Sequence, residues 1–465
     1  MRLSNVNITV KDKGLSLLSP NQALPHGKVG VSSAGTDNEV VLIADQAQIA
    51  DFGTGPLVNA LYDAFAGGAR VIYAVKATSD ITGLIGNITA TKTGQGNMAA
   101  VGSPLDSYHV IVEILSNGRF NTATFKYSLD GGDTETDAIT VPVDGVYAIT
   151  GTGITLNFSE YATEPDESFK AGDTYEFKTT APSASINNIT TAINALLNSA
   201  YTMEYIHVVG PSSSSVWTAL DTLAETAVTD KYKYIHFLCE AAGPSAGQTV
   251  SEWVQSLITT ALSFDSTRVA VSAAIGEIEE VNTSRVVERN AAGIISGRIS
   301  SIPVMRSPAR VRDGALPRVK SIRPAGLSEE QIALLNDAGY ITLRTYEGLT
   351  GVYITEGRIM AAADSDFQYI ELRRVMDKAC RNLRQAALQY KHAEADGDLT
   401  HLEASLQQVI DNMAGAGEIS SGQITIPEQD ILGTSTLRVN IRLVPVGIMR
   451  NIELEVGFEN PYRAS

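Results

Sequence analysis

Histidines are the side chains in this sequence best suited to acid–base chemistry or metal binding, and they are scattered along the chain. The six stand at positions 26, 109, 207, 236, 392 and 401. His207 and His236 each fall inside an apolar run, so neighbouring strands could bring them together. Flanking Ile, Val, Phe and Leu favour buried core histidines instead, and neither has a carboxylate or cysteine at the spacing of a metal site.

Three other features could bind phosphate, cations or thiol reagents. Ser212–Ser215 precede a predicted helix, and helix N-termini attract anions, but no Walker lysine or GxGxxG accompanies them, which favours ordinary capping. Asp130–Asp137 is acidic enough for a calcium loop, yet it lacks EF-hand spacing, so a polar turn is the better interpretation. Cys239 and Cys380 lie in apolar patterns typical of buried thiols. We expect no cofactor, no metal and no enzyme; a hydrolase with a carboxylate pair remains an alternative.

Residues 285–323 form the one basic zone of the chain. An exposed loop with local ion pairs and a surface that meets acidic partners are both compatible with it. Aromatic residues hardly interrupt the zone, which argues against nucleic acid. Together with a later Arg-Arg pair, it supplies the candidate ionic contacts to partners: Arg306, Arg310, Arg312, Arg318, Arg373 and Arg374.

Length and composition indicate a globular chain of several domains. The 465 residues are 44% hydrophobic and carry a formal net charge of −17, most of it in the first 267 residues. A chain of this length exceeds one ordinary core, so we expect two to four domains. The acidic balance excludes a basic nucleic-acid footprint overall. No secretory signal and no apolar run of bilayer length is evident, so we expect no membrane partner.

The stretch Gly55–Thr78 predicts the element that organises the core. Pro56 suits a first helical position, apolar residues then recur at helical spacing, and Gly67-Gly68 ends the helix. Val71–Val75 follows as a continuously apolar run, typical of a strand buried on both faces. Val40–Ala44 is a similar run upstream, so strand, helix and strand predict a βαβ unit.

The rest of the chain indicates an α/β fold, α+β overall, with a mixed sheet and packed helices as its core. Alternating strands and helices resume after residue 182, whereas 79–182 is rich in turn residues and short alternating runs, typical of an inserted all-β sandwich or barrel. Alternating segments at both ends predict extended β arms. The expected parts are an N-terminal arm (1–20), an α/β core (21–78 plus 183–325), the insertion (79–182), a C-terminal α/β domain (326–436) and C-terminal strands (437–465).

Several of these patterns resemble contractile-tail sheath proteins, which form the outer tube of contractile phages and related bacteriocin and injection machines. The Gly-Pro opening and Gly-Gly end of the 55–68 helix are one such pattern. A second is the order of elements after residue 334: a Leu-Asn-x-x-Gly turn at Leu335–Gly339, two strands, Gly357-Arg358, an acidic turn at Asp364–Asp366 and a long helix with Arg373-Arg374. The terminal strands are a third.

The resemblance implies a structural subunit that polymerises helically around an inner tube and contracts by subunit rearrangement, without nucleotide hydrolysis. Its partners would be other copies, the inner tube protein, and baseplate and terminator proteins, in a virion tail or phage-tail-like particle assembled in the host bacterial cytoplasm. A surface-layer or adhesin protein is the alternative. The resemblance also favours terminal arms that add strands to neighbours. Their candidate contact residues are Leu3, Val6, Ile8, Val10, Leu437, Val439, Ile441, Leu443, Ile452, Leu454 and Val456.

Overall fold

The computed structural model describes residues 24–458, with the side chains of 395–397 left out. It divides into two compact units, one up to Arg381 and one from Asn382 onward. The expectation of a mixed α/β fold with several sheets is confirmed.

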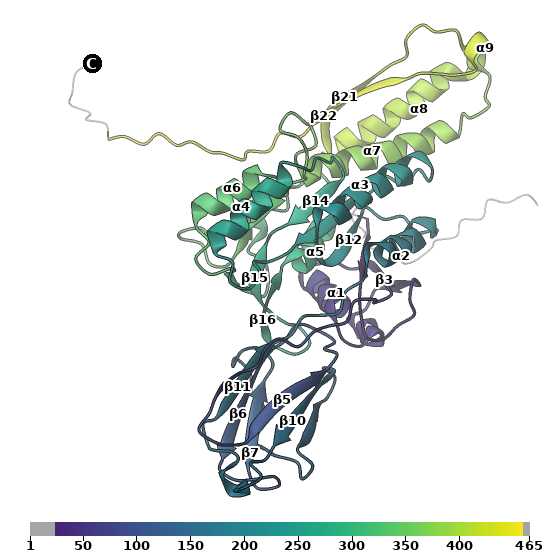
Figure 1. The fold of residues 1–465 in the computed structure, drawn as a ribbon. Helices are drawn as coiled ribbons and strands as arrows, with labels where there is room; N and C mark the ends of the chain where they lie inside the picture. Colours follow the sequence, from purple (N-terminus) through teal and green to yellow (C-terminus); the bar gives the residue numbers. More distant parts are fainter. Residues whose placement is uncertain (1–23, 459–465) are drawn as a thin grey trace, which may run out of the picture. The chain divides into compact units, whose positions relative to one another are not determined.

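A mixed sheet forms the centre of the first unit (Figure 1). Within residues 24–458 its seven strands follow the order β18-β14-β13-β12-β1-β3-β2, all parallel except β2 at one edge. The bounds are β1 (His26–Gly30), β2 (Val40–Ile43), β3 (Ile72–Lys76), β12 (Tyr205–Ser212), β13 (His236–Ala241), β14 (Val269–Ser272) and β18 (Tyr340–Ile341). Strands such as β13 are buried throughout, as parallel strands covered on both faces must be.

The predicted βαβ unit was wrong in its first strand. Val40–Ile43 (β2) is an antiparallel edge strand, with residues of intermediate or high exposure up to the buried Ile43. The parallel neighbour of β3 is instead β1, His26–Gly30, whose sequence HGKVG resembles a linker because of its glycines and two polar side chains. Gly27 and Gly30 are needed there because a Cβ at either would lie 2.9 Å from a packed side-chain atom.

Helices cover both faces of the sheet. One face packs on α2 (Ile186–Asn198), α3 (Ser214–Thr229), α4 (Val250–Ala261) and α6 (Glu329–Asp337). The other packs on α1 (Pro56–Ala66), α5 (Ala292–Ser301) and the first half of α7 (Ile370–Leu388). α1 and α5 touch backbone to backbone: a Cβ added to Gly297 would lie 2.1 Å from the Ala64 carbonyl oxygen, and one added to Gly67 would lie 2.2 Å from the Ile294 carbonyl oxygen.

Smaller sheets complete this side of the unit. β15 (Ile275–Glu279) lies between β16 (Val286–Asn290) and β17 (Val319–Ile322), and β19 (Leu343–Arg344) pairs with β20 (Tyr353–Ile354). Short 3₁₀ helices span Gln46–Phe52, Pro165–Glu167 and Val311–Asp313.

Between β3 and α2 the chain forms two antiparallel sheets around an aromatic-rich core of their own (Figure 1). The first orders β5 (Asn97–Gly102), β10 (Ile154–Ser159) and β9 (Val146–Ile149). The second orders β4 (Thr89–Thr91), β11 (Thr174–Lys178), β6 (His109–Ser116), β7 (Thr124–Ser128) and β8 (Ile139–Thr140). We call residues 79–182 the insertion.

The second unit contains the end of α7, then α8 (Ala395–Gly415), β21 (Ile419–Thr425), α9 (Ile431–Thr434) and β22 (Asn440–Pro445). β21 and β22 form an antiparallel hairpin. The predicted strand Ile452–Phe458 does not form here: the segment is exposed and without regular structure, and no strand of the described chain hydrogen-bonds to it.

Candidate functional site

The β21–β22 hairpin is one candidate surface for strand exchange. Among the described residues each of its strands pairs only with the other, so each keeps an open edge. Leu437, Val439, Ile441 and Leu443 are half-buried and alternate with exposed residues. Ile441 and Leu443 pair with Ile424 and Gly422 of β21, so these two predicted arm residues belong to a hairpin within this chain.

The segment that follows the hairpin carries apolar side chains in solvent. Ile452, Leu454 and Val456 are 70%, 83% and 90% exposed, and Phe458 is fully exposed. Glu453 and Glu455 alternate with them, so in an extended conformation the apolar residues would share one face. The other predicted arm residues, Leu3, Val6, Ile8 and Val10, lie outside the described residues.

The basic zone divides into exposed and buried parts. Arg306 and Arg310 reach Asp313 at 3.6 and 3.5 Å, and Arg318 reaches Glu279 at 3.3 Å. Arg312 is exposed and makes no ion pair within residues 24–458. These four predicted contact residues therefore lie at least partly in solvent, held by ion pairs of the weak, surface kind where they have any.

Arg373 and Arg374 do not lie on the surface as expected for contacts to a partner. Arg374 is fully buried and donates from Nε and Nη2 to Glu204 at 2.8 and 3.2 Å, and to the Ile302 carbonyl oxygen at 3.0 Å. Arg373 is 4% exposed and pairs with Asp377 at 2.7 Å. Each guanidinium is buried because a carboxylate from this unit neutralises it.

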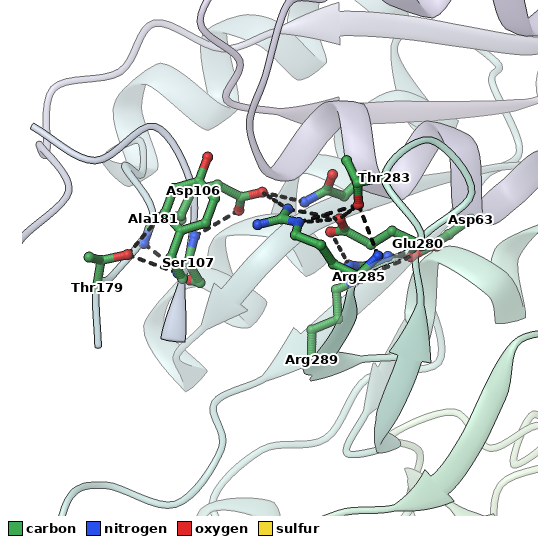
Figure 2. Close-up of polar contacts among 11 residues, drawn as sticks. Asp63, Asp106, Ser107, Thr179, Ala181, Glu280, Thr283, Arg285 and Arg289 are labelled. Atoms are coloured by element: carbon green, nitrogen blue, oxygen red, sulfur yellow. Dashed lines mark hydrogen bonds and ion pairs between the residues drawn. The ribbon is translucent and has the colours of Figure 1, made fainter. Parts of the chain in front are cut away.

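A buried ion network joins the core to the insertion (Figure 2). Arg289 of β16 donates to Asp63 of α1 at 2.8 Å and to Glu280 at 2.8 Å. Glu280 also accepts from Arg285 at 2.9 Å, and the guanidinium of Arg285 approaches the carboxylate of Asp106, in the insertion, to 4.0 Å. Burial raises the pKa of Asp106, and the nearby charge of Glu280 raises it further.

Further contacts attach Asp106 to both regions. Asn59 of α1 donates to the carboxylate of Asp106 at 2.6 Å. The backbone carbonyl of Asp106 accepts from the hydroxyl of Thr179 at 3.0 Å (Figure 2). The ring of Tyr108 lies 4.9 Å from the guanidinium carbon of Arg285. The insertion is thus held by charged and polar contacts as well as by its two chain connections.

A cavity of about 910 Å³ lies beside this network, at the carboxyl ends of β1, β12 and β13. Ligands of α/β proteins bind at such an edge where strand order reverses, as it does between β1 and β12. Three of the carboxylates that line it have partners: Asp63 and Glu280 bind Arg289, and Glu240 binds His207 at 2.9 Å.

The predicted core histidines are buried, but only one is fully hydrogen-bonded. His207 contacts Lys28 Nζ at 2.6 Å and Glu240 at 2.9 Å. Both ring nitrogens of His236 lack a partner within the described residues. Burial lowers the pKa of Lys28 to about 7 and raises the pKa of Glu240 to about 7.

No cluster of residues suited to metal binding occurs among the described residues. The side chain of Asp130 accepts from Ser128 and Thr134, so its acidic stretch forms a hydrogen-bonded turn. Cys239 is buried and Cys380 partly buried, both as free thiols. None of the described helices is long and apolar enough for a bilayer.

Comparison with known protein families settles the relationship. The model described as DUF2586, N-terminal domain, matches residues 3–358, and the one described as DUF2586, C-terminal domain, matches residues 366–463. This chain belongs to the DUF2586 family. A relative named "Putative tail sheath protein", from Haemophilus phage HP1, is 30% identical over 152 residues. The match covers 31% of this chain and 37% of that protein, so it spans little more than a third of the relative.

Solved structures extend this DUF2586 member's likeness to the whole fold. The PVC sheath complex of an extracellular contractile injection system, in its contracted state, aligns over 100% of both chains with a TM-score of 0.55 and 11% identity. A chain of the contracted anti-feeding prophage baseplate aligns over 98% of both with 0.55 and 12%. The sheath tail protein of Listeria innocua aligns over 92% of this chain and 93% of its own with 0.52 and 11%. The predicted resemblance to sheath proteins is confirmed as a shared fold.

Proposed function

We propose that this DUF2586 protein is the structural subunit of a contractile tail sheath, which polymerises helically around an inner tube and contracts by subunit rearrangement. Three findings support the proposal: the family, the fold shared with sheath proteins over nearly its full length, and the name of the phage relative. Its role is structural and not enzymatic. The particle would be a phage tail or phage-tail-like machine, assembled in the bacterial cytoplasm.

The observation that carries the proposal is the apolar segment after β22. Ile452, Leu454 and Val456 expose the alternating pattern of a half-buried strand, but no strand within residues 24–458 pairs with them. The β21–β22 hairpin keeps open edges that can accept one. A strand donated by one copy to the hairpin of another would satisfy both, and it would gain main-chain hydrogen bonds as well as apolar burial. Neighbouring subunits would stay connected while their folded units move.

The exposed part of the basic zone is the proposed surface for acidic partners. Surface ion pairs hold the guanidinium groups of Arg306, Arg310 and Arg318 only weakly. Arg312 is exposed and has no ion pair within residues 24–458. The inner tube protein, or a neighbouring copy, is the partner we propose for them; baseplate and terminator proteins would bind the ends of the assembled sheath.

A triple variant and a matched double variant test strand exchange. Replacing Ile452, Leu454 and Val456 by serine removes the apolar face, whereas replacing Glu453 and Glu455 by serine changes the opposite face of the same strand. We expect the first variant to remain folded, by circular dichroism, and to form no tubes in negative-stain electron microscopy. The second should still form striated cylinders. Normal tubes from the first variant would contradict strand donation, and flat sheets from the wild type would favour a surface-layer protein.

Deleting residues 1–18 tests the N-terminal arm in the same way. We expect a folded chain that no longer polymerises, because one of the two proposed tethers is gone. Full-length tubes from this deletion would remove the N-terminal arm from the proposal and leave the C-terminal one.

A further inference from the structure

Three aromatic rings form a ladder across the middle of the central sheet. His26 starts β1, Tyr205 starts β12 and His236 starts β13, and Tyr205 and His236 are register partners on adjacent strands. The ring centroids of His26 and Tyr205 are 4.9 Å apart, and those of Tyr205 and His236 are 5.2 Å apart, both stacked. All three side chains are buried.

The two imidazoles of this ladder have no hydrogen-bond partner in the part of the chain that the structure describes. Nδ1 and Nε2 of His26, and Nδ1 and Nε2 of His236, are buried without a partner among the described residues. A neutral imidazole leaves one donor and one acceptor unmet there, whereas an imidazolium would place a full charge with two unmet donors in the same apolar space. The site therefore tolerates the neutral ring much better than the charged one.

The charges that surround the ladder strengthen this preference. From α7 and the start of β14, His236 faces the guanidinium groups of Arg374, Arg373, Arg381 and Arg268, which two carboxylates, Glu204 and Asp377, neutralise only in part. On the other side, His26 faces Lys28 and His207, and Glu240 binds His207. From α5, Ser296 accepts hydrogen bonds from Lys28 through its hydroxyl and from Tyr205 through its backbone carbonyl.

We propose that the His26–Tyr205–His236 ladder is an acid-sensitive element, which loosens α5 and the first half of α7 from the sheet when its imidazoles are protonated. The insertion would keep its fold under the same conditions. Its single histidine, His109, has a side chain 33% exposed and binds Glu176 at the surface.

The direction of the effect follows from linkage. Burial, and then nearby cations, hold the pKa of His26 and His236 well below the ordinary 6.5; burial and Lys28 do the same for His207. Below pH 6.5 the unfolded chain takes up protons that the folded chain refuses. Each such imidazole can therefore raise the unfolding equilibrium constant up to tenfold per pH unit, until the pH reaches its folded pKa.

Two neighbours act in other ways. Glu240, whose pKa burial raises to about 7, stabilises the folded state as the pH falls from 7 toward 4.5. Lys28, whose pKa burial lowers to about 7, affects stability only above that pH. Asp63 and Asp106, whose pKa burial also raises, act in the same direction as Glu240. The contribution of the two ladder imidazoles is therefore read from the difference between the wild type and a variant that lacks them.

Tryptophan fluorescence isolates the response of the core. Both tryptophans of the chain, Trp217 on α3 and Trp253 on α4, are buried against the central sheet, and the insertion has none. Urea unfolding of the full chain, followed by this signal at pH 7.5, 6.5 and 5.5, compares the wild type with the double variant His26→Phe/His236→Phe. Phenylalanine keeps an aromatic ring beside Tyr205 and removes the titration.

In the wild type, the two ladder imidazoles should raise the unfolding constant by up to a hundredfold for each unit that the pH falls, and the double variant should lack this increase. The exposed control His401→Gln should follow the wild type. An unchanged pH dependence in a folded double variant would overturn the proposal. Should the variant not fold, ¹³C-histidine NMR of the wild type decides: three rings that stay neutral at pH 5.5 in the folded chain, those of His26, His207 and His236, support the ladder, and six rings that titrate near pH 6.5 refute it. As the pH is lowered, the amides of α5 should lose their protection from hydrogen exchange before those of β6 and β10 in the insertion. Loss of protection in all three at the same pH would refute the selective effect.

Discussion

The core and the insertion of the first unit solve the problem of a stable interior differently. The insertion buries apolar and aromatic side chains that come from strands close in sequence, such as Phe125, Phe158 and Phe177. The core buries ion pairs between distant segments: Glu204 meets Arg374 across 170 residues, and Asp63 meets Arg289 across 226. Burial of apolar area stabilises many similar arrangements, whereas a buried charge accepts few. The difference suggests, as a hypothesis, that the ion pairs of the core fix which elements meet.

Breaking a buried pair of the core should give the largest effect. Arg374→Met leaves the carboxylate of Glu204 buried without its ion-pair partner, which should cost about 3–5 kcal/mol in the free energy of unfolding. Urea unfolding followed by tryptophan fluorescence measures this cost. The double variant Arg374→Met/Glu204→Gln should recover a large part of it, since no charge then stays unpaired. A loss below about 1 kcal/mol in the single variant would mean that the pair specifies little.

A cavity in the insertion should cost less to the molecule as a whole. Leu156 is fully buried in β10, and Leu156→Ala should destabilise the insertion by about 2–4 kcal/mol. Because the insertion has its own core, hydrogen exchange should rise in β6 and β10 while the tryptophan transition keeps its midpoint. If the midpoint of the tryptophan transition fell by a corresponding amount, the core and the insertion would unfold as one unit, and the two interiors could not be independent.

The contact between the two regions should give the smallest effect. Asp106→Ala leaves Asn59 and Arg285 without that carboxylate, at a cost of about 1–2 kcal/mol. We expect faster proteolysis near residues 78–84 and 180–184, with both interiors intact. The exposed Asp144→Ala, in a turn of the same insertion, serves as the control and should leave the digestion rate unchanged.

Periodicity of apolar residues predicted most helices and several strands of the core. The apolar stripes of α3 and α4, and the continuous apolar runs of β3 and β13, are local signals that burial enforces. β1 was missed because its buried surface comes from close backbone packing at Gly27 and Gly30 and from polar groups with distant partners. The spacing of residues in the sequence cannot predict a contact between distant residues such as the one from Lys28 to Ser296.

In the candidate site, too, local patterns could be predicted from the sequence, whereas contacts between distant residues could not. The exposed alternation of Ile452, Leu454 and Val456 is legible in the sequence, and its role in assembly remains a prediction. Arg373 and Arg374 were predicted as ionic contacts to partners, but both are buried: Arg373 pairs with Asp377 and Arg374 with Glu204. The network of Asp63, Glu280 and Asp106 gave no local signal, since each residue gains its role only from the fold.

The glycine contact between α1 and α5 has a mechanical consequence. With backbone against backbone, neither helix has a layer of side chains along which it could slide or roll past the other. The two helices must therefore move together as one rigid body. Arg289, in the hairpin that leads into α5, binds both Asp63 of α1 and Glu280. Because Glu280 also binds Arg285, which lies beside Asp106, a displacement of the helix pair would be felt at the base of the insertion.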